Sequence, residues 1–119
     1  MSNSNSKDRK YPRKEICLGM LYKYGMEWFS ADIRDVTVGG ISFITSENFA
    51  PDTEINVFFG DSNAIGSNDF NTVVLRSQIL ESYSPPKYLV AVKLAEPNAK
   101  YVRDVEAYLI KQESESDSE

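Results

Sequence analysis

The chain has 119 residues, of which 41% are hydrophobic and 12% aromatic, enough for one folded domain and too many for a fully disordered chain. Its net charge of −5 excludes broad, non-specific binding to duplex nucleic acid, which needs a wide basic surface. The absence of histidine excludes histidine-based triads and metal sites, and a single cysteine, Cys17, excludes an internal disulfide or a cysteine zinc site.

The charge is distributed unevenly, because basic residues gather between Lys7 and Lys14 and acidic residues follow Gln112. We expect residues 1–8 to be a flexible leader, residues 9–112 to form one domain and residues 113–119 to be a disordered acidic tail. No signal peptide and no apolar run of membrane-spanning length is present. These features predict a cytoplasmic protein without a membrane span.

Short apolar runs with a period of two, separated by turn residues, predict an antiparallel all-β domain. The predicted strands are residues 16–24, 26–36, 41–45, 54–59, 72–83 and 88–95. The polar stretch 60–69 is expected to hold no strand, and two prolines stiffen the connection at 84–87.

After Pro97 the apolar period changes to three and four residues, which predicts one amphipathic helix with Asn98 as its N-terminal cap and an end near Lys111. The apolar positions of this helix are Tyr101, Val102, Val105, Tyr108 and Leu109. Six strands in an open sheet would leave edges exposed, whereas a closed sheet has none. We therefore predict a six-stranded antiparallel β-barrel with a C-terminal α-helix over one opening.

Two motifs carry the candidate chemistry, and the first is the basic segment 9–13. It places Arg9 and Arg13 four positions apart, with Lys10 between them, and Pro12 prevents the segment from continuing as a helix. The planar guanidinium fork matches phosphate oxygens and the O6 and N7 acceptors of guanine. The alternative interpretation is that this segment is a solvated basic leader that binds no ligand.

The second motif, residues 35–40, joins two predicted strands and combines Asp35, Thr37, Gly39 and Gly40. A carboxylate accepts hydrogen bonds from the N1 and N2 donors of guanine, a hydroxyl bonds a base edge or a phosphate, and glycine lets the backbone approach a flat ligand. The alternative is an ordinary strand connection in which the polar side chains cap backbone amides and the glycines supply positive φ angles.

Together the two motifs resemble the PilZ family of cyclic di-GMP receptors, whose pattern is RxxxR, a strand, and then [D/N]xSxxG. In that family the arginines contact phosphates and the Hoogsteen edges of guanine, and the second motif holds the other side of a base. The resemblance also implies a six-stranded barrel with a C-terminal helix across residues 9–110. The ligand-binding residues that it implies are Arg9, Arg13, Asp35, Thr37 and Gly40, with Lys10 and Gly39 as neighbours.

Two positions are expected to modify the implied ligand binding. Thr37 stands where the family has serine, which keeps the hydroxyl but adds a methyl group and stiffens χ1. Asp8 stands where some members carry a basic residue and bind an intercalated ligand dimer, so we expect one ligand per site.

The resemblance implies a receptor that changes conformation on binding cyclic di-GMP and signals to an unidentified effector protein, with motility, biofilm or virulence as the output. It implies neither catalysis nor a cofactor or metal, and the scattered carboxylates form no recognisable acid and base pair. One alternative is a divergent adaptor that binds proteins but no nucleotide. Another is a small barrel that binds single-stranded nucleic acid through Tyr11, Tyr22, Tyr24 and Trp28. The alternation of these aromatics indicates core positions instead.

Overall fold

The computed structural model describes residues 18–117, and the side chains of residues 18–113. The elements are, in chain order, β1 (Gly19–Tyr24), β2 (Glu27–Thr37), β3 (Gly40–Thr45), β4 (Glu54–Phe59), β5 (Asn68–Leu80), β6 (Lys87–Leu94) and α1 (Ala99–Asp117). The basic segment 9–13 and Cys17 lie outside the described residues. No helix in the described part of the chain is long and apolar enough to cross a membrane.

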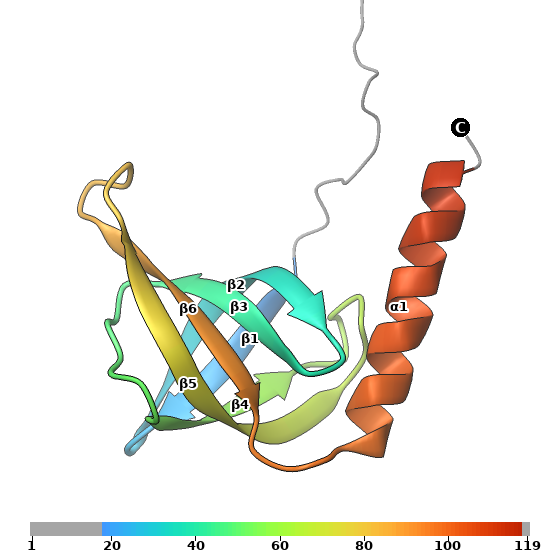
Figure 1. Ribbon diagram of the computed structural model, residues 1–119, viewed down its shortest axis with the longest axis horizontal. Coiled ribbons are helices and arrows are strands. Elements are labelled where there is room, and N and C mark those ends of the chain that lie inside the picture. Colours follow the sequence, from blue (N-terminus) through green and yellow to red (C-terminus); the bar gives the residue numbers. More distant parts are fainter. Residues whose placement is uncertain (1–17, 118–119) are drawn as a thin grey trace, which may run out of the picture.

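The strands close into one antiparallel barrel in the order β1-β2-β3-β6-β5-β4, and pairing of β1 with β4 completes the ring. α1 stands beside one end of this barrel, next to the β2–β3 turn and the β4–β5 loop, while the β5–β6 hairpin projects on the other side (Figure 1). The predicted six-stranded barrel with a C-terminal helix is therefore confirmed.

The alternating pattern places one face of each strand in the barrel core. Met20 and Tyr22 of β1 and Ile33 of β2 are buried, as predicted from the period of two. Two aromatics depart from the pattern, because Tyr24 and Trp28 are 48% and 50% exposed. The expectation of core positions is therefore wrong for both.

Their exposure has a structural reason. Trp28 precedes an inward-facing phenylalanine on β2, so strand alternation turns its indole outward, where Lys23 lies 5.8 Å from the ring centroid and Phe58 packs against its edge. Tyr24 is the last residue of β1, and its ring meets that of Phe49, from the β3–β4 connection, edge to face. The inward position of Tyr24 thus falls at the end of β1, beyond the buried part of the core, whereas Tyr22, two residues earlier, is fully buried.

α1 docks on the barrel through an aromatic cluster. The Tyr101 ring lies 4.6 Å from that of Phe70 and 6.3 Å from that of Phe59, and both Tyr101 and Val105 are fully buried. Asn98 caps the helix as predicted, because its Oδ1 accepts a hydrogen bond from the Tyr101 amide at 3.0 Å. The cap and the cluster together fix the first two turns of α1 against the barrel.

Both predicted ends of β5 and the predicted end of α1 are wrong. β5 begins at Asn68 and ends at Leu80, so the end of the 60–69 stretch is strand, because Asn68 and Asp69 pair with the end of β4 and barrel pairing overrides their low strand propensity. α1 continues to Asp117, past the predicted end near Lys111 and into the segment expected to be disordered. That extension contains no glycine or proline to break a helix, and it begins with the good helix formers lysine, glutamine and glutamate.

Candidate functional site

The β2–β3 turn carries the second predicted motif and lies against the barrel end that α1 covers (Figure 1). Thr37 and Gly40 pair across the turn, so Val38 and Gly39 are its two connecting residues. The Thr37 hydroxyl accepts a hydrogen bond from the Gly39 amide at 3.2 Å and donates one to the Gly40 carbonyl at 3.3 Å. Thr37 thereby stabilises the turn from within, as the alternative interpretation of this motif expected.

A β-bulge in β2 places the carboxylate of Asp35 on the outer surface of the barrel. The pairing with β3 shifts between Ile33 and Asp35, so β2 holds one extra residue there. Ile33 is buried, and regular alternation would turn Asp35 inward as well. The bulge instead leaves Asp35 exposed, where it accepts a hydrogen bond from the Ser42 hydroxyl at 3.2 Å. Among the described residues, Ser42 is its one hydrogen-bond donor, which leaves acceptor capacity for donors of a ligand.

The two motif glycines have different surroundings, and neither adopts a positive φ. A Cβ on Gly40 would lie 2.2 Å from the Val92 carbonyl oxygen and 3.0 Å from the Lys93 Cα, which are backbone atoms of β6. A Cβ on Gly39 would meet only the Thr37 Oγ1, at 4.0 Å. Gly40 is therefore required by the approach of β3 to β6, whereas Gly39 leaves open space at the turn.

A shallow hollow of about 220 Å³ lies on the outer surface beside this turn. The residues that line it are Asp35, Thr37, Gly39, Gly40, Ile41, Ser42, Leu75, Val92 and Lys93. The structure thus brings together the predicted residues of the second motif at one concave surface. Its polar groups are a carboxylate, two hydroxyls and one ammonium group.

Sequence reasoning missed Leu75 and Lys93, which line the same hollow. Lys93 is on β6 directly opposite Gly40, and its exposed side chain adds a positive charge. Leu75 is 49% exposed because Val74 before it is buried and strand alternation turns the next side chain outward. Neither residue belongs to a motif, so the one available signal was the order of strands in the closed barrel.

Tyr101 connects α1 to the turn. Its hydroxyl lies 2.8 Å from the Thr37 carbonyl oxygen and 3.0 Å from the Gly40 carbonyl oxygen, and it donates to these two acceptors. Burial raises the pKa of the Tyr101 phenol well above its ordinary value of 10.0. The phenol therefore remains a hydrogen-bond donor throughout the physiological pH range.

A second contact holds α1 to the β4–β5 loop. The Asp104 carboxylate accepts hydrogen bonds from Asn68 at 2.9 Å and from the Lys100 ammonium at 2.7 Å, and that ammonium also bonds the Ser67 carbonyl. The hydrogen bonds from Lys100 and Asn68 lower the pKa of Asp104 below its ordinary value of 3.8. Together with Tyr101, this contact fixes the first half of α1.

Because the folded-state pKa of Asp104 is depressed, its contribution to stability is present above about pH 4 and is lost as the pH falls through the folded-state pKa. We expect Asp104→Asn to lower the free energy of unfolding by about 0.5 kcal/mol at pH 7, since the pair is largely solvated. Urea unfolding of both proteins should show this difference shrinking as the pH falls below about 4. Glu106→Gln, on the exposed face of the same helix, is the control, and an equal effect there would contradict the assignment.

The chain enters the barrel close to the candidate site. The Leu18 carbonyl accepts a hydrogen bond from the Ile33 amide at 2.8 Å, just before the bulge that exposes Asp35. Arg9, Lys10 and Arg13 lie outside the described residues, so the structure does not place them. About five residues separate Arg13 from Leu18, and an extended chain of that length spans roughly 17 Å.

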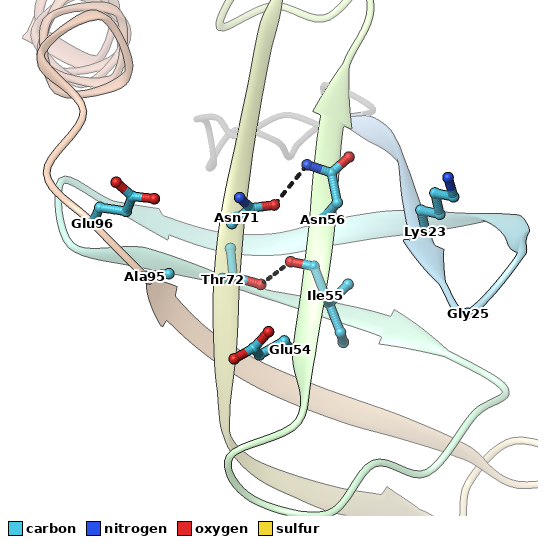
Figure 2. A pocket seen from close by; sticks show the side chains of 9 residues that line it. All are labelled: Lys23, Gly25, Glu54, Ile55, Asn56, Asn71, Thr72, Ala95 and Glu96. Atoms are coloured by element: carbon cyan, nitrogen blue, oxygen red, sulfur yellow. Dashed lines mark hydrogen bonds between the residues drawn. The ribbon is translucent and has the colours of Figure 1, made fainter.

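A larger hollow of about 430 Å³ lies elsewhere on the barrel surface (Figure 2). Its lining residues include the carboxylates of Glu54 and Glu96, and Asn56 donates a hydrogen bond to Asn71 at 3.0 Å. The two carboxylates outnumber the one lysine of the lining, Lys23, and disfavour an anionic ligand. None of the motif residues that the structure describes lies there. Among the described residues, no three acidic or cysteine side chains are grouped so as to hold a metal ion.

Comparison with solved structures finds the same fold in MrkH of K. pneumonia. The apo structure aligns with a TM-score of 0.68 at 16% identity, over 98% of this chain and 55% of that chain. The MrkH–c-di-GMP complex aligns with a TM-score of 0.69 at 15% identity, over 96% and 55%. A P2(1) crystal form of MrkH gives 0.71 at 18% identity, over 92% and 52%. The chain thus spans about half the length of these proteins.

No curated protein matches the chain significantly. The sequence model of the PilZ domain does match, over residues 7–111, which is nearly the whole chain and includes both predicted motifs. The closed barrel, the helix and this match agree, and the chain belongs to the PilZ domain family.

Proposed function

We propose that the protein is a receptor for cyclic di-GMP and that the hollow beside the β2–β3 turn receives one of its guanines. The observation that carries this proposal is the bulge-exposed carboxylate of Asp35, in a concave surface that also contains Gly39 and Lys93. Guanine offers two neighbouring donors, N1 and N2, which a carboxylate accepts. Membership of the PilZ family and the fold shared with MrkH support the same ligand.

The residues of the hollow suit different parts of the ligand. Asp35 is assigned to the guanine donors, and the open space at Gly39 admits the flat base close to the backbone. Thr37 keeps a hydroxyl lone pair for the ligand although the turn already uses its proton. Lys93 is assigned to a phosphate, and Leu75 supplies apolar surface against a base or ribose.

The hollow is too small to enclose a whole cyclic dinucleotide, since its 220 Å³ is below the range of about 300–1,000 Å³ typical of ligand pockets. A second wall is needed, and we assign it to the basic segment 9–13, which precedes Leu18 in the chain; the Leu18 carbonyl bonds the Ile33 amide close to the bulge that exposes Asp35. Arg9 and Arg13 are assigned to phosphates and Hoogsteen edges, with Lys10 adding positive charge. Asp8 would repel a second set of phosphates, which supports one ligand per site.

The proposed receptor acts without catalysis. Binding would bring the basic segment over the barrel and create a new surface for an effector protein in the cytoplasm, with motility, biofilm formation or virulence as the output. Among the described residues, the hollow holds one carboxylate and one ammonium group, which suit hydrogen bonding to a base and to a phosphate.

Calorimetric titration with cyclic di-GMP tests the proposal directly. We expect wild-type protein to bind one molecule per chain and Asp35→Asn to bind about tenfold more weakly, a loss of about 1.4 kcal/mol, because the amide replaces an acceptor by a donor at guanine N1 and N2. Asp32→Asn is the matched control. It removes the same charge from an exposed position of β2 outside the hollow, and its affinity should equal that of the wild type.

Other outcomes of the titration separate the rival functions. No heat and no amide shifts up to high micromolar ligand would contradict the receptor and favour an adaptor without nucleotide, for which the half-exposed Trp28 and the exposed Leu21 offer an apolar surface. A rise in polarisation of a fluorescent oligonucleotide at physiological salt would instead favour a barrel that binds single strands, with Trp28 and Tyr24 as stacking platforms.

A further inference from the structure

The hydroxyl of Tyr101 contacts both strands of the candidate binding turn at once. Tyr101 is fully buried, and its single O–H proton is shared between the carbonyl oxygens of Thr37 and Gly40, at 2.8 and 3.0 Å. These carbonyls frame the two connecting residues of the turn. The phenol therefore links α1 to both strand ends that carry the motif, in addition to the backbone pairing of Thr37 with Gly40.

The other contacts of the turn do not involve α1. The Thr37 hydroxyl bonds only within the turn, to Gly39 and Gly40, and the Leu94 amide donates to the Gly39 carbonyl at 3.1 Å. Those bonds shape the loop and attach it to β6. Of the described contacts, the Tyr101 hydroxyl is the one that ties the turn to α1.

Tyr101 is itself held firmly in place. Its amide donates to the cap residue Asn98 at 3.0 Å, its ring packs between Phe59 and Phe70, and the next turn of the helix is fixed by Asp104. Because the backbone and the ring of Tyr101 are both fixed, its hydroxyl holds the two carbonyl groups that it bonds in a defined position relative to α1. Burial keeps the phenol protonated, so this donor is constant.

We propose that Tyr101 is a positioning residue for cyclic di-GMP, which holds the β2–β3 turn in the binding conformation and couples α1 to the site. The inference rests on the proposed function. A turn that is already ordered loses less entropy on binding, so the phenol raises affinity without touching the ligand. Coupling is reciprocal, and the bound ligand in turn stabilises the docked position of α1.

Tyr101→Phe and Tyr22→Phe form a matched pair for the test. Both tyrosines are fully buried, and Tyr22 also loses one hydrogen bond on substitution, the 2.8 Å contact with the Thr45 hydroxyl at the opposite end of β3. We expect similar decreases in urea stability for the two variants. Calorimetry should show roughly five- to tenfold weaker cyclic di-GMP binding for Tyr101→Phe only. Without ligand, the amide shifts of Gly39 and Gly40 should move only in that variant.

A second measurement uses the wild type and so does not depend on the variant folding. Saturation with cyclic di-GMP should slow amide hydrogen exchange at Val102 and Val105 of α1 by a larger factor than at Tyr22. Equal affinity of wild type and Tyr101→Phe, equal losses in both variants, or uniform protection would overturn the inference alone. A wild type that binds no cyclic di-GMP would overturn the proposed function, and the inference with it.

Discussion

Replacing Gly40 with alanine is expected to destabilise the protein by about 3 kcal/mol. The new methyl carbon would lie 2.2 Å from the Val92 carbonyl oxygen and 3.0 Å from the Lys93 Cα. Both are backbone atoms, so no side-chain rotation relieves the overlap and β3 must move away from β6. Urea unfolding followed by the fluorescence of Trp28, the only tryptophan of the chain, measures the loss as a lower midpoint.

Gly39→Ala is the control for this prediction. It places the same methyl group one residue away, where the nearest atom is the Thr37 Oγ1 at 4.0 Å, and the φ of Gly39 is not positive. We expect its free energy of unfolding to lie within about 0.5 kcal/mol of the wild type. Similar stabilities for the two variants would show that β3 and β6 adjust freely at this point.

The contrast assigns different tasks to two glycines that the sequence presents as a pair. Gly40 is needed for closure of the barrel, whereas a larger residue at Gly39 would mainly obstruct a ligand in the hollow. Gly39→Ala should therefore reduce the free energy of cyclic di-GMP binding more than the free energy of unfolding. Gly40→Ala should reduce the free energy of unfolding more than that of binding.

The sequence predicted the barrel and the start of the helix because each rests on a local rule. Alternation with a period of two follows from strands with one buried face, and the cap at Asn98 precedes an apolar period of three and four. The predicted end of α1, near Lys111, was wrong because no glycine or proline follows Lys111 and an acidic composition by itself does not end a helix.

The candidate site was only partly predictable, because its remaining features depend on strand pairing. One inserted residue in β2 exposes Asp35, but this bulge does not change the local composition. Leu75 faces outward by regular alternation, and its place in the hollow depends on the pairing of β5 with β6. Lys93 reaches the hollow only because β3 pairs with β6, a neighbour distant in sequence. The motif thus predicted the residues of the turn, whereas Leu75 and Lys93 could be assigned to the hollow only once the order of strands in the closed barrel was known.

Arg9→Ala and Arg13→Ala should each weaken cyclic di-GMP binding by about 2 kcal/mol, or roughly thirtyfold. The hollow by itself covers only part of the ligand, so the proposed site depends on the basic segment for its second wall. A guanidinium makes two charge-assisted hydrogen bonds to a phosphate or a Hoogsteen edge, and alanine makes none. Calorimetry at fixed salt measures the loss, and unfolding curves should coincide with the wild type.

Two further variants separate the geometry of the guanidinium from its charge. Lys14→Ala removes one positive charge from the same segment and should change affinity by no more than about twofold, because exposed charges are screened. Arg13→Lys keeps the charge but loses the planar fork, so it should lose most of what Arg13→Ala loses. Equal losses for Lys14→Ala and Arg13→Ala would mean that the segment acts only as a diffuse positive charge. Unchanged affinity in both arginine variants would remove Arg9 and Arg13 from the site and leave Asp35 and Lys93 as its remaining charged contacts.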